Sequence, residues 1–493
     1  MIQVLLGALS WLWENWYIVS IFLSIVIIFF QRNEPESVWA WLLVLYFLPF
    51  LGFFLYLFLH QDINKRHMFK VKEQHDELSA VMYGKASECE QSLENISDPE
   101  LSDFNQIVRY NRNVGDNAYG EDNTVEIIID GQKKFERLIE EIDKAEHYIN
   151  LQYYIIQNDE LFAQIRTHLY KKVREGVKVR ILYDPLGSRH LSVRVRNEMK
   201  EQGIMLGNFF PALFGIFQMR VNYRNHRKIA VIDGRVAFVG GYNIGREYIS
   251  KDKFFGYWRD THLILTGSAV LGLEKRFALD WQYATKENLF LQTQMFRPLL
   301  RKGENALPEK GKVGVQVISS GPDEKEAQIR NTYAYLMTHA KKSICIQTPY
   351  FIPDQTIMNA LTTAARSGVE VKLMIPCKPD HPFVYWATYS YMGDLLASGA
   401  KCCIYENGFL HAKGVSVDGK AVCCGTANMD IRSFKLNFEV NAAVFDRGTA
   451  AEMERIFEED THHCRQITLE EYNNRSMSIR FKEQVSRLLS PVL

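Results

Sequence analysis

Two long apolar stretches open the chain and form its most pronounced hydrophobic pattern. They cover residues 11–31 and 38–59, and each approaches the about 20 apolar residues with which a helix crosses a bilayer. A short polar turn with a proline separates them, and tryptophans lie near their ends, as in membrane-interface positions. The pattern predicts a two-helix transmembrane hairpin over residues 1–65. A pair of buried core helices and, for the first stretch, a secretory signal peptide are the alternatives.

The charges that flank these stretches predict an orientation. The turn between them holds one cation, Arg32, whereas several follow the second stretch: Lys65, Arg66, Lys70 and Lys72. Because cations gather on the cytoplasmic side of membrane helices, the large C-terminal body is expected in the cytoplasm. Residues 66–122 are mostly polar and are interpreted as a connecting region.

Beyond residue 123, segments with a strand period alternate with segments of helical period, and the same order occurs twice. The first copy has a strand at 125–129, a helix at 135–145 and strands at 149–155 and 177–183; the second has a helix at 333–340 and strands at 344–348 and 369–375. The segments REGVKVRIL and RSGVEVKLM also match between the copies. The sequence therefore predicts an α/β fold of two duplicated halves, residues 123–305 and 306–493.

Composition narrows the class of protein. Lys+Arg and Asp+Glu balance at 58 each, which disfavours a nucleic-acid-binding protein, since these usually carry a basic excess. The 8 cysteines show no zinc-ligand spacing. We expect reduced, structural thiols, as is typical of a cytosolic body.

One motif carries the candidate chemistry, and it occurs once in each half. The pattern H-x-K-x4-D is followed after six residues by G-[GT]-x-N. Its polar members are His226, Lys228, Asp233 and Asn243 in the first half and His411, Lys413, Asp418 and Asn428 in the second. Because residues two apart on a strand project to the same face, each half offers an imidazole and an ammonium to one place.

This set of groups fits a phosphodiester substrate. The ammonium and amide groups can bind the non-bridging oxygens, while one imidazole attacks phosphorus and the other protonates the leaving alcohol. No carboxylate cluster suited to Mg²⁺ is visible, so the scheme needs neither a metal nor a cofactor.

The paired motifs resemble those of the phospholipase D superfamily, and further stretches resemble bacterial cardiolipin synthases. These stretches are NHRKIAVIDG at 225–234, GGYNIGREY at 240–248, SSGPD at 319–323, QTPYFIPD at 347–354 and FLHAKG at 409–414. The resemblance implies that the two halves form a single active site. It also implies transfer of a phosphatidyl group between two phosphatidylglycerol molecules through a phosphohistidine, giving cardiolipin and glycerol. A hydrolytic phospholipase D or another phosphodiesterase of the same superfamily is the alternative.

The same resemblance implies roles for individual residues. His226 is expected as the nucleophile and His411 as the general acid and then base, with Lys228 and Lys413 completing the catalytic set. The motif aspartates Asp233 and Asp418 are counted with that set, although they are expected to brace the fold rather than carry protons. Asn243 and Asn428 are expected to support phosphate binding. The carboxylates Asp260 and Glu439 are expected to orient the imidazoles, each from the half opposite its histidine.

The expected partners are phosphatidylglycerol and other anionic membrane lipids, with no nucleic acid, at the bacterial plasma membrane. An apolar segment at 211–217 precedes the first motif. It is interpreted as either a lipid-facing loop or a buried segment.

Overall fold

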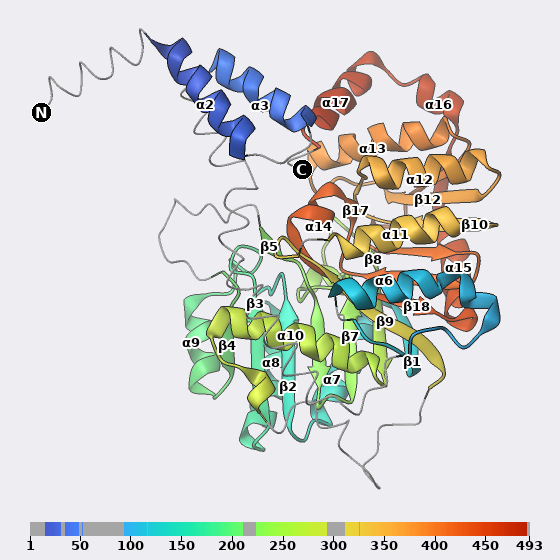
Figure 1. Ribbon diagram of the computed structural model, residues 1–493. Helices are drawn as coiled ribbons and strands as arrows, with labels where there is room; N and C mark the ends of the chain where they lie inside the picture. Colours follow the sequence, from blue (N-terminus) through green and yellow to red (C-terminus); the bar gives the residue numbers. More distant parts are fainter. Residues whose placement is uncertain are drawn as a thin grey trace, which may run out of the picture. The chain divides into compact units, whose positions relative to one another are not determined.

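The computed structural model describes residues 15–30, 35–48, 52, 93–115, 117–210, 223–292, 311–324 and 326–490 (Figure 1). Outside these residues lie the predicted end of the second apolar stretch, the cations at 65–72, the segment at 211–217 and the predicted boundary between the halves at residues 305 and 306. The chain divides into two compact units, of which one contains the N-terminal helices and the other the α/β body.

The N-terminal unit contains two antiparallel helices, α2 (Trp16–Phe30) and α3 (Pro35–Phe47). The hydroxyl of Ser20 donates to the carbonyl of Leu45 at 3.1 Å, and the rings of Trp16 and Tyr46 meet edge to face. Leu45 is buried between the helices, whereas many apolar side chains on the outer faces are exposed: Ile18, Ile21, Phe22, Ile25, Ile28, Trp39, Leu43 and Phe47. Across the described ranges, no helix has both the length and the apolar character that crossing a membrane requires.

The first half of the body is built on a mixed sheet with the strand order β4-β3-β2-β6-β7-β8-β1. Its strands are β1 (Tyr119–Asp130), β2 (Tyr148–Tyr153), β3 (Lys178–Tyr183), β4 (Met205–Asn208), β6 (Ile229–Ile232), β7 (Val236–Gly240) and β8 (Trp258–Thr266). Its helices are α7 (Gly131–Asp143), α8 (Glu160–Arg174), α9 (Val193–Glu201), η3 (Arg246–Ile249), α10 (Ala269–Thr285) and η4 (Leu289–Leu291). The parallel pairs β2–β3 and β3–β4 follow from the helical crossovers between them.

The second half repeats this arrangement with the strand order β19-β13-β12-β10-β15-β16-β18-β9. Its strands are β9 (Val313–Ser320), β10 (Ser343–Gln347), β12 (Glu370–Pro376), β13 (Lys401–Tyr405), β15 (Gly414–Val417), β16 (Ala421–Gly425), β18 (Asn437–Phe445) and β19 (Cys464–Ile467), with β11 (Phe351–Ile352) and β17 (Met429–Asp430) as a separate pair. Its helices are α11 (Gln328–His339), α12 (Gln355–Arg366), α13 (Pro382–Leu396), α14 (Ile431–Lys435), α15 (Arg447–Thr461), α16 (Leu469–Asn473) and α17 (Met477–Leu488). The matching strand orders confirm the predicted duplication.

Part of the predicted connecting region packs on the body. Residues 93–115 include η1 (Pro99–Phe104) and α6 (Asn105–Gly115). Apolar side chains of these helices, such as Phe104 and Val108, are buried in the core of the second half. This region therefore contributes to the fold of the second half.

The two sheets face each other across a shared apolar core. Alternate residues of β8, including Leu263 and Leu265, pack in this core with Val422 and Val444 from the second half, whereas Ile264 points into the core of the first half. This follows from the two-residue period of a strand. Adjacent cysteines also separate in this way: Cys423 and Cys424 lie in different cores, and the cysteines among the described residues are free thiols.

Two short strands each pair with a strand of the other half. β5 (Arg224–Asn225) pairs in parallel with the start of β18, at Asn437 and Phe438. β14 (Phe409–Leu410) pairs in parallel with the start of β8, at Trp258 and Arg259. These two pairings bring the motifs to the junction between the halves.

Candidate active site

Strands β5 and β14 place each motif histidine next to a carboxylate of the other half. β5 ends just before His226, whose backbone N–H donates to the carbonyl of Phe438 at 3.0 Å. β14 ends just before His411, whose backbone N–H donates to the carbonyl of Arg259 at 2.7 Å. The next residue on β18 is Glu439, and the next on β8 is Asp260.

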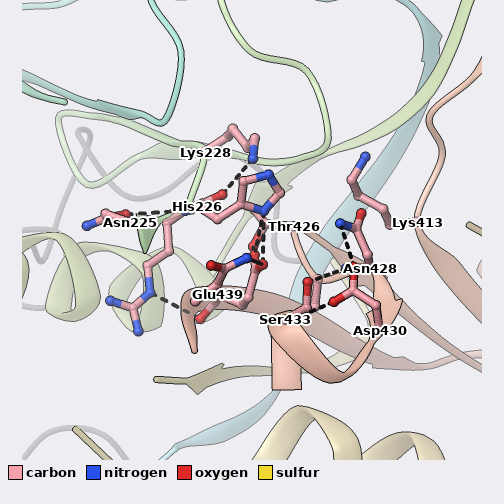
Figure 2. Close-up of polar contacts among 12 residues, drawn as sticks. Asn225, His226, Lys228, Lys413, Thr426, Asn428, Asp430, Ser433 and Glu439 are labelled. Carbon is pink, nitrogen blue, oxygen red and sulfur yellow. Dashed lines mark hydrogen bonds and ion pairs between the residues drawn. The ribbon is translucent and has the colours of Figure 1, made fainter. Parts of the chain in front are cut away.

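Both imidazoles bind these carboxylates through Nδ1. His226 Nδ1 lies 2.9 and 3.0 Å from the two oxygens of Glu439, and the contacts of these two side chains are drawn in Figure 2. His411 Nδ1 lies 2.6 Å from Asp260 Oδ2. The carboxylates are fully buried, while the histidine side chains are 12% and 10% exposed. A proton held on Nδ1 leaves the Nε2 lone pair for a substrate.

The two carboxylates stay ionised in this buried place. Burial raises the pKa of Asp260, but Lys413 and His411 outweigh it, so that the pKa lies below its usual value. Burial likewise raises the pKa of Glu439, and His226 and Lys228 reverse that effect. Each carboxylate is therefore an anion that fixes its imidazole.

The surroundings of both imidazoles favour their neutral form. Burial lowers the pKa of His226 to about 4, against the opposing attraction of Glu439 and with a further lowering from Lys228. Burial, followed by Lys413, lowers the pKa of His411 to about 4. The charge of Lys413 also acts on His226, and that of Lys228 on His411, so the two motifs act on each other electrostatically.

The motif lysines are fixed by the backbone of their own motifs. Lys228 Nζ donates to the carbonyl of His226 at 2.7 Å, and Lys413 Nζ donates to the carbonyl of His411. Lys413 Nζ also lies 2.7 Å from His411 Nδ1 and 3.8 Å from Asp260 Oδ2. Burial lowers the pKa of Lys413 to about 8 and that of Lys228 well below its usual value. A bound phosphate would favour the charged form of both amines.

The motif asparagines differ in their contacts. Asn243 accepts the backbone N–H of Ile155 at 3.1 Å and donates to the hydroxyl of Tyr248 at 3.1 Å, so its amide is engaged by the protein. Asn428 donates to Asp430 at 3.4 Å, and its buried Oδ1 has no hydrogen-bond partner among the described residues (Figure 2). Asn428 is therefore the asparagine with remaining capacity for another group.

The motif aspartates lie at the far ends of the motif strands. Asp233 accepts the backbone N–H groups of Glu146, His147 and Tyr148 at 2.7–2.9 Å. Asp418 accepts the equivalent N–H groups of residues 341–343 at 2.7–2.9 Å. Each aspartate lies seven residue steps of about 3.3 Å along the chain from its histidine, so neither carboxylate reaches the imidazoles.

Three supporting groups were not predicted from the sequence. Thr426 donates its hydroxyl to Glu439 Oε2 at 2.6 Å, behind His226. The buried guanidinium of Arg227 binds both oxygens of Asp280 at 2.6–2.8 Å and the carbonyl of Glu439 at 3.1 Å. A second buried pair, Arg259–Asp460, lies beside Asp260. The sequence signals for these groups are a threonine inside the G-[GT]-x-N pattern and charged residues within or next to apolar segments.

Comparisons with known proteins find relatives over nearly the full chain. The family model described as the PLD-like domain of cardiolipin synthase matches residues 138–255 and 333–461, and that of the phospholipase D-nuclease N-terminal region matches residues 18–59. The chain is 44% identical to a cardiolipin synthase of Oceanobacillus iheyensis, over 99% of this chain and 100% of that protein. It is also 44% identical to the major cardiolipin synthase ClsA of Bacillus subtilis, over 97% of this chain and 98% of that protein.

A solved structure shares the fold. The crystal structure of phosphatidylserine synthase from Haemophilus influenzae superposes with a TM-score of 0.58 at 16% identity, over 79% of this chain and 100% of that one. The duplicated fold, the paired motifs and near-full-length identity to curated relatives together show that the chain belongs to the cardiolipin synthase family of the phospholipase D superfamily.

Proposed function

We propose that the protein makes cardiolipin by transferring a phosphatidyl group from one phosphatidylglycerol to another. The observation that carries this proposal is the pair of imidazoles, each fixed by a carboxylate of the opposite half. In the first step, Nε2 of one histidine attacks phosphorus, and the bond from phosphorus to the glycerol headgroup breaks. When the anionic phosphodiester is bound, its negative charge raises the pKa of the other imidazole, which then carries a second proton on Nε2. That imidazole gives this proton to the leaving glycerol oxygen.

In the second step, a terminal hydroxyl of the second phosphatidylglycerol gives its proton to the same imidazole and attacks phosphorus. The nitrogen–phosphorus bond breaks, and cardiolipin is released. One phosphodiester replaces another, so the reaction needs no nucleotide. Lys228 and Lys413 bind the non-bridging oxygens and stabilise the charge that develops on them.

The surroundings of the two imidazoles support His226 as the nucleophile. Glu439 binds its Nδ1 with both oxygens, which leaves the Nε2 lone pair for attack. His411 has the ammonium of Lys413 beside its ring as a second close partner, which His226 lacks. The two imidazoles therefore differ in their surroundings, as an attacking group and a proton carrier do.

Burial of the site supports transfer over hydrolysis. Both histidine side chains are about nine-tenths buried, so few water molecules have access to a phosphohistidine. Exclusion of water favours the alcohol of a second lipid as acceptor. Hydrolytic phospholipase D activity is the competing outcome.

We infer that the N-terminal helices anchor the chain in the bacterial plasma membrane. The apolar outer faces of α2 and α3 and the match of residues 18–59 to an N-terminal family region support this inference. The cations at 65–72 support a cytoplasmic position for the catalytic body.

The test is product analysis with the purified full-length chain. Phosphatidylglycerol labelled in both its acyl chains and its headgroup glycerol is supplied in vesicles. We expect cardiolipin and free glycerol in equal amounts, and no product from the His226→Ala variant. Phosphatidic acid in place of cardiolipin would show that water is the acceptor and would contradict the transfer reaction.

A further inference from the structure

The C-terminal helix α17 has its polar side inward and its apolar side outward. Met477, Phe481 and Leu488 are 76%, 71% and 81% exposed. Their spacings of four and seven residues place them on one stripe of the helix. Glu483 and Ser486, on the other side, are buried. Helices at the surface of a soluble body normally bury their apolar stripe, so this orientation is reversed.

Ion pairs hold α17 in this orientation. Glu483 binds the guanidinium of Arg475 at 2.6 Å, and that guanidinium stacks on the ring of Tyr472. Arg487 binds Asp394 of α13 at 2.6 Å. A rotation that buried the stripe would break both pairs and leave Glu483 without its partner. The outward apolar stripe is therefore a built feature of the fold.

Cations border the stripe on both sides. Arg480 and Lys482 are exposed and lie on opposite edges of it, and Glu483, the acidic residue of the helix, points inward. Lys482 Nζ lies 5.2 Å from the ring centre of Trp386 on α13. A short helix with an apolar stripe between cations, next to a tryptophan, has the composition of helices that lie in the plane of an anionic bilayer surface.

The helix is connected to the active site through α13. The start of α13 follows Asp380, which binds the hydroxyl of Tyr350. The neighbouring Thr348 accepts the backbone N–H of Met429, the residue after Asn428. A surface that held α17 would therefore also orient this side of the active site.

We propose that α17 docks the catalytic body on an anionic phospholipid surface, with Met477, Phe481 and Leu488 inserted among the lipids and Arg480 and Lys482 at the headgroups. This inference rests on the proposed function, because the substrate is a lipid of that surface. A second copy of the chain is the other occupant that an apolar stripe would fit, and the experiment separates the two.

The experiment compares full-length variants on two forms of substrate. One form is phosphatidylglycerol in mixed phosphatidylglycerol–phosphatidylcholine vesicles, and the other is short-chain phosphatidylglycerol below its micellar concentration. Phe481→Asp should lower kcat/KM on vesicles by about tenfold, which corresponds to the loss of one inserted aromatic side chain. It should leave kcat/KM on the dispersed lipid within about twofold. Phe481→Leu should retain vesicle activity, and so should Val193→Asp, at an apolar position on α9 of the first half that is 61% exposed.

Unchanged vesicle activity in Phe481→Asp would overturn the proposal. A loss on both substrates, together with a smaller sedimenting species, would also overturn it and assign the stripe to a second copy. Lys482→Glu, at an exposed side chain, is a second variant that should weaken the response to the phosphatidylglycerol fraction of the vesicles. If the wild type itself made no cardiolipin from either form, the proposed function would fail and not the docking surface alone.

Discussion

At the scale of single residues, the two matched motifs have unequal surroundings. The hydroxyl of Thr426 binds Glu439 behind His226. The corresponding position in the first half is Gly241, where a Cβ atom would lie 2.0 Å from Asp260 Oδ1, so that no side chain fits there. On that side, Lys413 stands beside His411 instead. The two imidazoles are therefore chemically distinct, as different catalytic roles require.

The assignment of roles predicts where a covalent adduct forms. With a nitrophenyl phosphodiester, whose leaving group needs no proton, His411→Ala should accumulate a phosphohistidine on His226, since the acceptor alcohol then lacks a base. His226→Ala should form no adduct. Mass spectrometry after a rapid quench at alkaline pH would locate the group. An adduct on His411 in the His226→Ala protein would reverse the two roles.

The shifted pKa values predict an unusual pH profile for kcat/KM. With the nitrophenyl phosphodiester, whose departure needs no proton from His411, the acid limb reports His226 alone. Because the pKa of His226 is lowered to about 4, its neutral attacking form persists well below pH 6, and the acid limb should lie near that value. Because the pKa of Lys413 is lowered to about 8, and that of Lys228 is lowered as well, phosphate-binding charge is lost above that pH, so activity should fall there. The profile is measured on dispersed substrate at constant ionic strength. An acid limb near 6.5 would show that His226 is not desolvated as the structure indicates.

Much of the site at this scale followed from spacing. The two H-x-K patterns showed which imidazoles and amines share a strand face, because a strand has a period of two. Spacing alone did not indicate that Asp260 and Glu439 cross between halves, and the resemblance to a known family supplied that expectation. Buried pairs such as Arg227–Asp280 were missed because partners far apart in sequence leave no local pattern.

At the scale of elements, the motif aspartates belong to tight turns. Asp233 and Asp418 have φ values of 53° and 55°, and each precedes a glycine with φ near 60°. Two successive left-handed residues make the type I′ turn that joins β6 to β7 and β15 to β16, and Asp-Gly is a preferred pair for it. Their carboxylates accept N–H groups from the loop before the central strand. The motif therefore includes a turn whose function is structural.

This position predicts that Asp418→Ala lowers the stability of the protein and leaves catalysis nearly unchanged. Three backbone N–H groups lose their acceptor, and alanine must adopt a left-handed conformation, so we expect a loss of about 2–4 kcal/mol in the free energy of unfolding. The kcat of the folded fraction at low temperature should stay within about threefold of the wild type. Thermal unfolding and lipid turnover measure the two effects. Asp233→Ala is the matched variant, and a folded, stable, inactive protein in either case would give the aspartate a chemical role.

Elements with a clear period were predictable, whereas short elements were not. The strands of both halves alternate apolar residues over several positions. β5 and β14 contain two residues each, too few for any pattern, and they form because the opposite half offers a strand start to pair with. Likewise, α6 is polar on its exposed side, and its packing on the second half could not be seen before the fold was known.

At the scale of the whole molecule, both halves contribute to the surroundings of each imidazole. Each imidazole depends on a carboxylate from the other half, and each motif lysine influences the histidine of the other motif. One attacking group and one proton donor are thus available for one reaction. The two halves should behave as a single catalytic unit.

A single site predicts that one lysine substitution abolishes turnover. Lys228→Met and Lys413→Met should each lower kcat by at least about a hundredfold, since each removes a charge that stabilises the same transition state. Turnover of labelled phosphatidylglycerol is the measurement, with circular dichroism as the control for folding. A variant that retained about half of the activity would indicate two independent sites.

The pairing of each imidazole with a carboxylate of the other half also bears on the origin of the chain. A protein made of one such half would hold its imidazole away from any carboxylate of its own, because the partner comes from the facing β8 or β18. It could complete a site only as a symmetric homodimer, with two equivalent histidines. Fusion of two copies into one gene removes the requirement for identical sides, so later substitutions can act on one side alone. Thr426 occupies the position equivalent to Gly241, and Glu439 the position equivalent to Asp260, and both are differences of this kind. Through such differences, two interchangeable imidazoles could become an attacker and a proton carrier.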